Sequence, residues 1–276
     1  MERAVAAGPA ERERRMPARA TYLDASHFCR VIAVSDIHGC DTAFDALLTK
    51  VAFSDGDALV LLGDYAERGT QALPLVRRIM ALALRGNTFP LMGNCDNVVE
   101  ELFQPRFRGD MLRYLTRHPH TVLHEMLCEQ GMPFSAETPP SPSLDDVRAV
   151  VQAHYGPERA FLAGLPHILY TDTHVFVHAG LDAGLPLTAQ DDDRCLKRKD
   201  FFATAPAFEK TLVVGHMPGQ FLTDPPSGDV LFDAARNLIS IDGGATAAAP
   251  AQLNALVIEN GAYRTVSVPV DEAPSR

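Results

Sequence analysis

The chain has 276 residues, of which 46% are hydrophobic, and its formal net charge is −10. This length can form one large domain or two small ones with a sizeable core. The acidic balance, with no Lys/Arg cluster beyond residues 194–199, argues against a nucleic-acid-binding groove, and no apolar run approaches the length of a membrane span.

Residues 1–28 are expected to form a charged, Ala-rich, disordered tail without a hydrophobic signal core, and Met16 is an alternative start. The spacing of the cysteines fits neither a zinc knuckle nor a disulfide framework, and their number is odd. They are Cys29, Cys40, Cys95, Cys128 and Cys195. A reducing, cytoplasmic location is therefore the expected one.

The first hundred residues alternate between strand and helix patterns. Short apolar runs predict strands at 30–36, 58–62 and 88–92, and helical periodicity predicts helices at 42–50 and 70–84. Strands that alternate with helices in this way favour a largely parallel sheet covered by helices.

The next segment, 97–165, has a helical pattern with a break in a Pro- and Ser-rich loop at 131–143. We expect a helical insertion within a single domain that spans residues 29–270, not an independent domain. Strand patterns then return at 167–171, 174–178, 211–215, 230–233, 237–241, 252–258 and 262–268.

Several apolar strands end in a polar residue of a type that binds metals. These strand-end residues are Asp36 and His38 in VIAVSDIHG, Asp64 in LVLLGD, Asn94 in FPLMGN, His178 in VFVHAG and His216 in TLVVGH. Ligand sites of α/β sheets lie beyond the carboxyl ends of the strands, which would bring these side chains to one edge. Each alone is more often a turn residue, a cap or a hydrogen-bonded core residue, but that explanation must then hold at five strand ends at once.

Imidazole and carboxylate ligands together suit Mn, Fe or Zn. Two divalent ions about 3.5–4 Å apart need an anionic bridge, which Asp64 can supply. A bridging role also explains why an acid directly follows a buried strand. Such an ion pair activates a shared water and neutralises charge on phosphoryl oxygens, so the residues indicate hydrolysis of phosphate esters.

The ordered motifs SDIHG, GDYAERG, GNCD, VFVHAG and VVGHMP resemble those of calcineurin-like metallophosphoesterases. They are most similar to the phosphoprotein-phosphatase branch, which includes bacterial Ser/Thr phosphatases and symmetrical dinucleoside tetraphosphatases. The resemblance runs from about residue 30 to 268. It implies an α/β fold in which a β-sandwich of two mixed sheets is flanked by helices, with metal ions at the strand ends.

The resemblance also implies a role for each matching residue. The implied metal ligands are Asp36 and His38 at a first ion, Asp64 as the bridge, and Asn94, His178 and His216 at a second ion. Arg68 of the ERG triplet would bind phosphoryl oxygens through its forked donors. Its alternative is a solvent-facing residue at the start of a helix.

The chain departs from the branch's pattern at two places. Glu67 stands where the usual GDxxDRG has its second Asp, and GNCD replaces the usual GNHE, so that Cys95 stands for His and Asp96 for Glu. In the family that histidine donates a proton to the leaving group and is oriented by the second Asp of GDxxDRG, the position that Glu67 takes here. We therefore include Cys95 and Asp96 with Arg68 as candidate catalytic residues; the alternative for Cys95 is a buried space-filler. GNCD also resembles a motif of small bacterial phosphodiesterases in the same superfamily.

A thiol is a poorer proton donor than imidazole, with a reference pKa near 8.5 against about 6.5. Esters with poor leaving groups, such as phosphoserine, would therefore suffer most from the change at Cys95. Aryl phosphates, phosphoanhydrides and activated diesters would suffer least.

Other candidates carry less information. Arg198 in LKRKDFF could line the phosphate pocket or lie on a solvated helix face, and the glycines of IDGG (241–244) could allow close backbone approach or form a tight turn. Four histidines in the helical region are expected to take no part in the site: His118, His120, His124 and His154.

The sequence thus predicts a two-metal phosphoesterase that cleaves phosphomonoesters as Ser/Thr protein phosphatases do, through metal-bound hydroxide. Manganese is the expected ion, with iron or zinc as alternatives. Phosphodiesters or dinucleoside polyphosphates are the alternative substrates, and a catalytically weak member that binds a phosphate or a partner is the alternative of another class. The expected partner is a phosphorylated small molecule, a nucleotide or a phosphoprotein.

Overall fold

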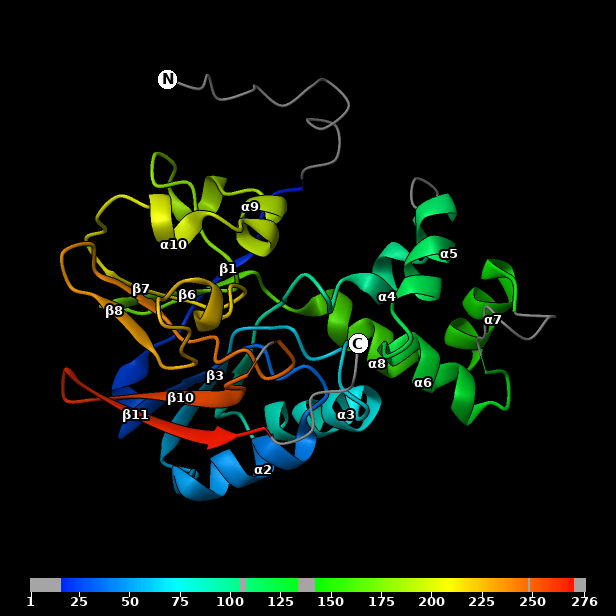
Figure 1. Ribbon diagram of the computed structural model, residues 1–276, viewed down its shortest axis with the longest axis horizontal. Coiled ribbons are helices and arrows are strands. Elements are labelled where there is room, and N and C mark those ends of the chain that lie inside the picture. Colours follow the sequence, from blue (N-terminus) through cyan, green and yellow to red (C-terminus); the bar gives the residue numbers. More distant parts are fainter. Residues whose placement is uncertain (1–15, 105–107, 134–141, 248, 271–276) are drawn as a thin grey trace.

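The computed structural model describes residues 16–104, 108–133, 142–247 and 249–270. Two β-sheets pack face to face, helices cover their outer faces, and further helices gather to one side (Figure 1). This arrangement confirms the predicted α/β fold of two mixed sheets flanked by helices.

The first sheet has five strands. In spatial order they are β11 (Ala262–Pro269), β10 (Gln252–Glu259), β2 (Arg30–Val34), β3 (Asp57–Leu61) and β4 (Thr88–Pro90). β2, β3 and β4 are parallel, while β10 runs antiparallel to both β2 and β11. The crossover helices α2 (Asp41–Lys50) and α3 (Ala72–Ala83) cover the outer face of this sheet, as the alternating pattern predicts (Figure 1).

Alternation along β2 shows how this sheet is buried on both faces. Ile32 and Val34 join the core that includes side chains of α2 and α3. Val31 and Ala33 join the core that lies between the two sheets. Because successive strand residues point to opposite faces, one short apolar run fills both cores.

The second sheet has six strands. In spatial order they are β1 (Ala20–Tyr22), β5 (Ile168–Tyr170), β6 (His174–Val177), β7 (Thr211–Val214), β9 (Leu238–Ser240) and β8 (Leu231–Asp233). The short helices α9 (Asp192–Lys197) and α10 (Phe201–Thr204) lie outside it (Figure 1). Single 3₁₀ turns occur at η1 (Ala25–His27), η3 (Leu187–Ala189) and η4 (Gly219–Phe221).

The edge strand β1 falls within the segment expected to be a disordered tail, so that expectation is wrong for residues 20–22. β1 pairs in parallel with β5, with Ala20 opposite Ile168 and Tyr22 opposite Tyr170. It has three residues, none of them buried, so it lacks the alternation of apolar residues that marks a strand in a sequence. Residues 1–15 lie outside the described part of the chain.

In its described residues, the segment expected to be helical contains five helices: α4 (Val98–Glu101), α5 (Arg108–Arg117), α6 (Val122–Glu129), α7 (Leu144–His154) and α8 (Gly156–Gly164). Met126, Val151 and Leu162 belong to the same core as α2 and α3, so these helices pack onto the sandwich. Most of the expected break at 131–143 lies outside the described residues. Over the parts of the chain that are described, no helix combines the length and the apolar character needed to cross a bilayer.

Candidate metal centre

The six predicted metal ligands lie together beyond the ends of five strands from both sheets. Asp36, Asp64 and Asn94 follow β2, β3 and β4 of the first sheet, whereas His178 and His216 follow β6 and β7 of the second. The backbone N–H of His216 donates to Oδ2 of Asp36 over 2.9 Å, although the two residues are 180 positions apart in the chain. The packing of the two sheets therefore assembles the site.

Acceptor atoms converge at the half of the site expected to hold the second ion. Nδ1 of His178 lies 3.0 Å from the carbonyl oxygen of Leu62, which fixes the ring's proton on Nδ1 and leaves the Nε2 lone pair free. That Nε2 is 3.0 Å from Oδ1 of Asn94, 3.2 Å from Nδ1 of His216 and 3.4 Å from Oδ1 of Asp64. Lone pairs that face one another repel unless a cation lies between them, so this donor set fits a divalent ion.

The orientation of the Asn94 amide depends on that ion. If its oxygen and nitrogen were exchanged, the nitrogen would donate to both His178 and His216, which is the better arrangement for the bare protein. A cation at the point of convergence would instead favour the observed orientation, in which the amide oxygen points toward His178.

Asp64 is shared between the two halves of the site. Its Oδ1 faces His178, while its Oδ2 lies 3.6 Å from Nε2 of His38, which in turn is 3.9 Å from Oδ1 of Asp36. Two groups of potential metal-binding atoms, each within 4.8 Å of one another, contain Asp64: one with His38 and Cys95, the other with His178 and His216. This geometry fits the bridging role that the motifs imply.

The ligands stand on backbone that L-amino acids rarely adopt. The φ angles are 53° at Asp36, 49° at His38, 59° at Asp64 and 69° at His216, and Arg68 has 79°. Each left-handed residue of this kind costs about 1 kcal/mol or more, and such strain concentrates at functional sites. The surrounding core holds these residues in place, because the strands that precede them are buried on both faces.

Two glycines that precede ligands allow the loops to approach one another. A Cβ on Gly93 would come within 2.2 Å of both the backbone nitrogen and Oδ1 of Asp64, and a Cβ on Gly215 within 2.3 Å of Oδ2 of Asp36. Any other residue at these positions would push the ligands apart.

Burial and nearby charges give three of the side chains the protonation states that metals require, whereas the neighbouring carboxylates raise the pKa of His178 and burial raises that of Asp36 to about 6. Burial lowers the pKa of His38 and of His216 to about 3, so both rings are neutral at pH 7. Burial alone would raise the pKa of Asp64, but His178 and His38 hold it below its usual range. Neutral imidazoles and an ionised carboxylate are the forms that coordinate a cation.

Asp96 is a structural clamp on the ligand loops. Its carboxylate accepts hydrogen bonds from the backbone N–H groups of Asp64, Tyr65, Ala66 and Gly93, at distances of 2.7–3.1 Å. Both oxygens are used in this way in a fully buried position. Among the described residues, no contact of Asp96 supports the catalytic role considered from the sequence, and we assign it as a positioning residue.

Cys95 and Glu67 occupy the positions of the family's proton donor and its orienting acid, and they remain neighbours. The Cys95 thiol donates to Oδ2 of Asp64 over 3.2 Å and also interacts with Glu67. Burial, together with the charges of Asp64 and Glu67, raises the pKa of the Cys95 thiol well above its usual value. The thiol therefore stays protonated at neutral pH and gives up its proton reluctantly.

Beside the donor cluster lies a cavity of about 620 Å³, which we call the reaction pocket. It is lined by Glu67, Arg68, Arg117, His118, Pro119, His120, Lys199, His216, Met217, Pro218, Phe221, Thr246 and Ala247. Arg68 thus reaches the space where a phosphate would bind, as the ERG motif implies. Its side chain is 46% exposed, which leaves the guanidinium accessible to a ligand.

The expectation that the histidines of the helical region stay away from the site is wrong for His118 and His120, which line the reaction pocket. The backbone N–H of Arg68 donates to the carbonyl of His120 over 2.6 Å, so the turn between α5 and α6 is tied to the ligand loop. Nδ1 of His118 is 3.5 Å from Oε1 of Glu67. Pro119, which breaks the helical pattern, is the sequence signal for this turn.

Of the basic residues in LKRKDFF, Lys199 and not Arg198 lines the reaction pocket. Arg198 instead donates to the carbonyl of Leu181 and lies over the ring of Phe201. In the IDGG stretch, Asp242 is buried, and burial and the charge of Asp36 raise its pKa well above the usual range. The sequence drew attention to the glycines there and missed the carboxyl group.

A sequence model of the calcineurin-like phosphoesterase family matches residues 29–238. The chain belongs to this family. The matched region includes the motifs from Asp36 to His216, so membership of the family confirms the resemblance seen in the motifs. The chain is accordingly a metallophosphoesterase, a class of hydrolases that acts on phosphate esters.

Several named proteins are similar to parts of this metallophosphoesterase. A symmetrical bis(5'-nucleosyl)-tetraphosphatase of Acidovorax ebreus is 42% identical over 103 residues, covering 31% of this chain and 36% of that protein. The asymmetrical bis(5'-nucleosyl)-tetraphosphatase PrpE of Bacillus subtilis is 26% identical over 159 residues, covering 54% of this chain and 57% of that protein. The chain spans between 22% and 57% of the length of the curated relatives it matches.

A solved structure of a candidate diadenosine tetraphosphatase superimposes with a TM-score of 0.61 at 20% sequence identity, covering 91% of this chain and 98% of the other. At this identity the likeness concerns the fold alone. It extends the agreement from the motifs to nearly the whole of the metallophosphoesterase.

Proposed function

We propose that this metallophosphoesterase hydrolyses phosphoanhydride bonds of dinucleoside polyphosphates, using two divalent ions. From the sequence alone, phosphomonoester cleavage was the first expectation and dinucleoside polyphosphate cleavage was an alternative. The observation that carries the proposal is the buried thiol of Cys95, hydrogen-bonded to Oδ2 of Asp64, at the position of the family's proton donor. The relatives named as tetraphosphatases support the same substrate class.

The leaving group decides between the two substrate classes. A serine alkoxide leaves only when it is protonated, and general acid help is worth about 10²–10⁴-fold in such reactions. A nucleotide released from an anhydride bond ends in a phosphate whose second pKa is about 6, so it leaves as a stable anion. A weak acid such as the Cys95 thiol therefore limits phosphoserine cleavage much more than anhydride cleavage.

The residues of the chain divide the remaining tasks. Asp36, His38, Asp64, Asn94, His178 and His216 would hold the two ions. When bound, these ions supply activation of water and charge neutralisation on the phosphoryl oxygens. Arg68 adds a forked pair of donors for the same oxygens, and Asp96 fixes the loops that carry Asp64 and Asn94. The mixture of imidazole, carboxylate and amide ligands supports manganese, with iron or zinc as alternatives.

We also place the protein in the cytoplasm. All five cysteines are free in the structure, and buried thiols such as Cys95 and Cys195 suit a reducing compartment.

Substrate comparison tests the proposed function. The purified protein, loaded with Mn²⁺, is assayed on diadenosine tetraphosphate, p-nitrophenyl phosphate and a phosphoserine peptide, with products separated by chromatography. We expect kcat/KM to be highest for the tetraphosphate and lowest for the peptide. A preference for the phosphoserine peptide would contradict the proposal, and binding of phosphate compounds without turnover of any of them would establish the catalytically weak alternative.

A further inference from the structure

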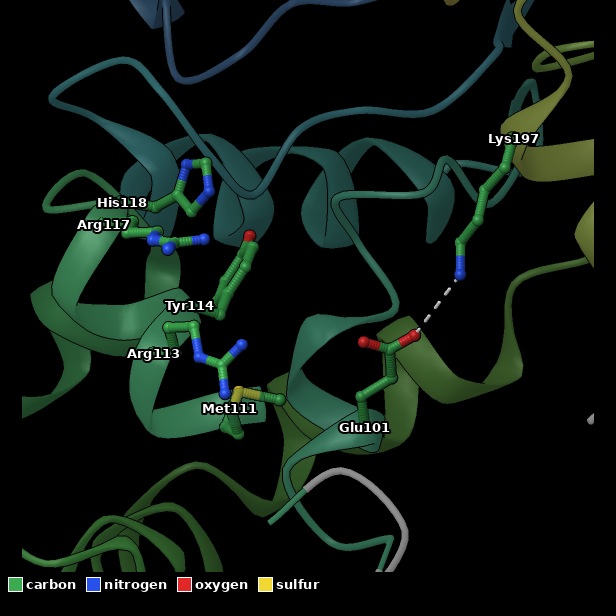
Figure 2. Close-up of a pocket in the computed structure, with 7 residues that line it drawn as sticks. All are labelled: Glu101, Met111, Arg113, Tyr114, Arg117, His118 and Lys197. Carbon is green, nitrogen blue, oxygen red and sulfur yellow. Dashed lines mark ion pairs between the residues drawn. The ribbon is translucent and has the colours of Figure 1, made fainter. Parts of the chain in front are cut away.

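A second cavity, of about 340 Å³, adjoins the reaction pocket, and we call it the α5 pocket (Figure 2). It is lined by Glu101, Met111, Arg113, Tyr114, Arg117, His118 and Lys197. Arg117 and His118 line both cavities, so the α5 pocket begins where the reaction pocket ends. None of its other lining residues belongs to the metal centre or to the five ordered motifs SDIHG, GDYAERG, GNCD, VFVHAG and VVGHMP.

Helical spacing explains why α5 can form one wall of this pocket. Arg113 and Arg117 are four residues apart, as are Tyr114 and His118, so all four lie along one face. The rings of Tyr114 and His118 are 4.6 Å apart between centroids. Figure 2 shows these side chains on one side of the cavity, with Lys197 and Glu101 on the opposite side.

The two pockets together form a cationic path on an acidic protein. Five cationic side chains line them, namely Arg68, Lys199, Arg117, Arg113 and Lys197. Among the described residues, three acids oppose these charges. Glu67 lines the reaction pocket, and Glu101 and Asp193 each place a carboxylate oxygen 3.8 Å from Nζ of Lys197. In a chain with a formal net charge of −10, such a local excess of cations indicates an anionic ligand longer than one phosphate group.

We propose that the α5 pocket binds the leaving half of the substrate, with Arg113, Arg117 and Lys197 on its phosphates and Tyr114 beside its base. The proposal rests on the proposed function, because only a substrate with a second nucleotide reaches beyond the reaction pocket. Guanidinium groups match phosphate oxygens with paired donors, and an aromatic ring offers a stacking surface to any nucleobase. The α5 pocket thus selects for substrates with a nucleoside polyphosphate tail.

Binding of a nucleotide whose β,γ bridge cannot be hydrolysed tests the pocket directly. Titration calorimetry of adenosine 5'-(β,γ-methylene)triphosphate into the Mn²⁺-loaded protein compares the wild type with Arg113→Gln and Lys197→Gln. Each substitution should raise the Kd about tenfold, the typical effect of losing one charged hydrogen bond. The matched control is Arg264→Gln, which removes one exposed positive charge from β11 and should leave the Kd at the wild-type value.

Substitutions at Tyr114 distinguish the contribution of the base to binding from that of the phosphates. Tyr114→Leu should weaken binding of the nucleotide several-fold and leave binding of inorganic tripolyphosphate at the wild-type level, while Tyr114→Phe should keep both. Circular dichroism of each variant identifies those that fail to fold. If the α5 variants fail to fold, Lys197→Gln decides the outcome, because it changes a half-exposed side chain outside α5.

Turnover provides the second measurement. The ratio of kcat/KM for diadenosine tetraphosphate to that for p-nitrophenyl phosphate should fall about tenfold in Arg113→Gln and Lys197→Gln and stay unchanged in Arg264→Gln. Equal losses on both substrates, or an unchanged Kd, would overturn the proposed subsite. If the wild type cleaves p-nitrophenyl phosphate but not the tetraphosphate, the proposed function fails, and calorimetry with the nucleotide still decides the role of the α5 pocket.

Discussion

The thiol of Cys95 donates a hydrogen bond to Oδ2 of Asp64, the carboxylate that both halves of the metal centre share. The thiol is buried beside this carboxylate, at the position of the family's proton donor. The identity of residue 95 should therefore control which leaving groups the protein can release.

Cys95→His tests this control. An imidazole beside Glu67 restores the usual pairing of proton donor and orienting acid, so kcat/KM for a phosphoserine peptide should rise about 100-fold, at the lower end of general acid effects. Turnover of diadenosine tetraphosphate should change less than about threefold, because its leaving group needs no proton. Steady-state kinetics on both substrates measure the effect, with Cys95→Ser as the control that adds no stronger acid. A phosphoserine peptide that gains nothing from the histidine would show that Cys95 only fills space.

Metal removal should abolish activity, and Asp64 should decide whether activity returns. Chelation followed by added Mn²⁺ should restore turnover of the wild type. In Asp64→Asn the shared negative charge is lost, so turnover should fall at least about 10³-fold and stay low at any Mn²⁺ concentration. Elemental analysis should find fewer ions per chain than in wild type. The matched control is Asp172→Asn, an exposed acid in the turn between β5 and β6. Equal metal content in all three proteins would contradict the bridging role.

Asp96→Asn should reduce stability as well as activity. An amide in place of the carboxylate turns one acceptor into a donor that faces backbone N–H groups of the ligand loops. We expect a loss of about 3 kcal/mol in the free energy of unfolding, because hydrogen bonds to a charged group contribute about 1.5–3 kcal/mol each. Urea denaturation measures it. Cys95→Ser, at the next position, should keep most of the wild-type stability, and an equally stable Asp96→Asn protein would refute the clamp.

His174 should make the protein less stable in mild acid. The ring is buried, with Nδ1 2.8 Å from Oγ1 of Thr173 and Nε2 2.9 Å from the hydroxyl of Tyr263. Burial lowers its pKa from 6.5 to about 4, so below pH 6.5 the unfolded chain takes up this proton before the folded one. The contribution of the neutral ring is complete above pH 6.5 and is lost as the pH falls toward 4.

Between pH 7 and pH 5 this linkage amounts to about 1–2 kcal/mol for His174. The measurement is the difference in urea midpoints at the two pH values, compared between the wild type and His174→Gln. The variant removes only this ring, so the pH dependence of all other groups cancels in the comparison. Identical changes in the two proteins would mean that His174 is protonated in the folded state as well.

The sequence predicted the sandwich and the convergence of the strand-end side chains because both depend on short-range patterns. Apolar runs such as 30–34 and 58–61 mark buried strands, and Asp36 and Asp64, two and three positions after these runs, reach the same sheet edge. The parts that it missed depend on contacts between distant segments. Nothing near Lys199 or His118 indicates that both reach the reaction pocket, because the turn at 118–121 is held there by Arg68, about 50 positions earlier.

Asp96 shows a second kind of limit. Its motif suggested a catalytic role, whereas four backbone N–H groups from two loops donate to its carboxylate. A sequence gives the type of each side chain, but it does not show which backbone groups will lie beside it. Roles that depend on converging main-chain donors become visible only in three dimensions.

The left-handed backbone at His38 and His216 has a consequence for how this protein can change over generations. Glycine at either position would relax the main chain and favour the folded state, yet it would remove an imidazole from the centre. A descendant that no longer needs to cleave the substrate could therefore gain stability while it loses activity. Heat tolerance that rises while catalysis disappears would be the trace of that history.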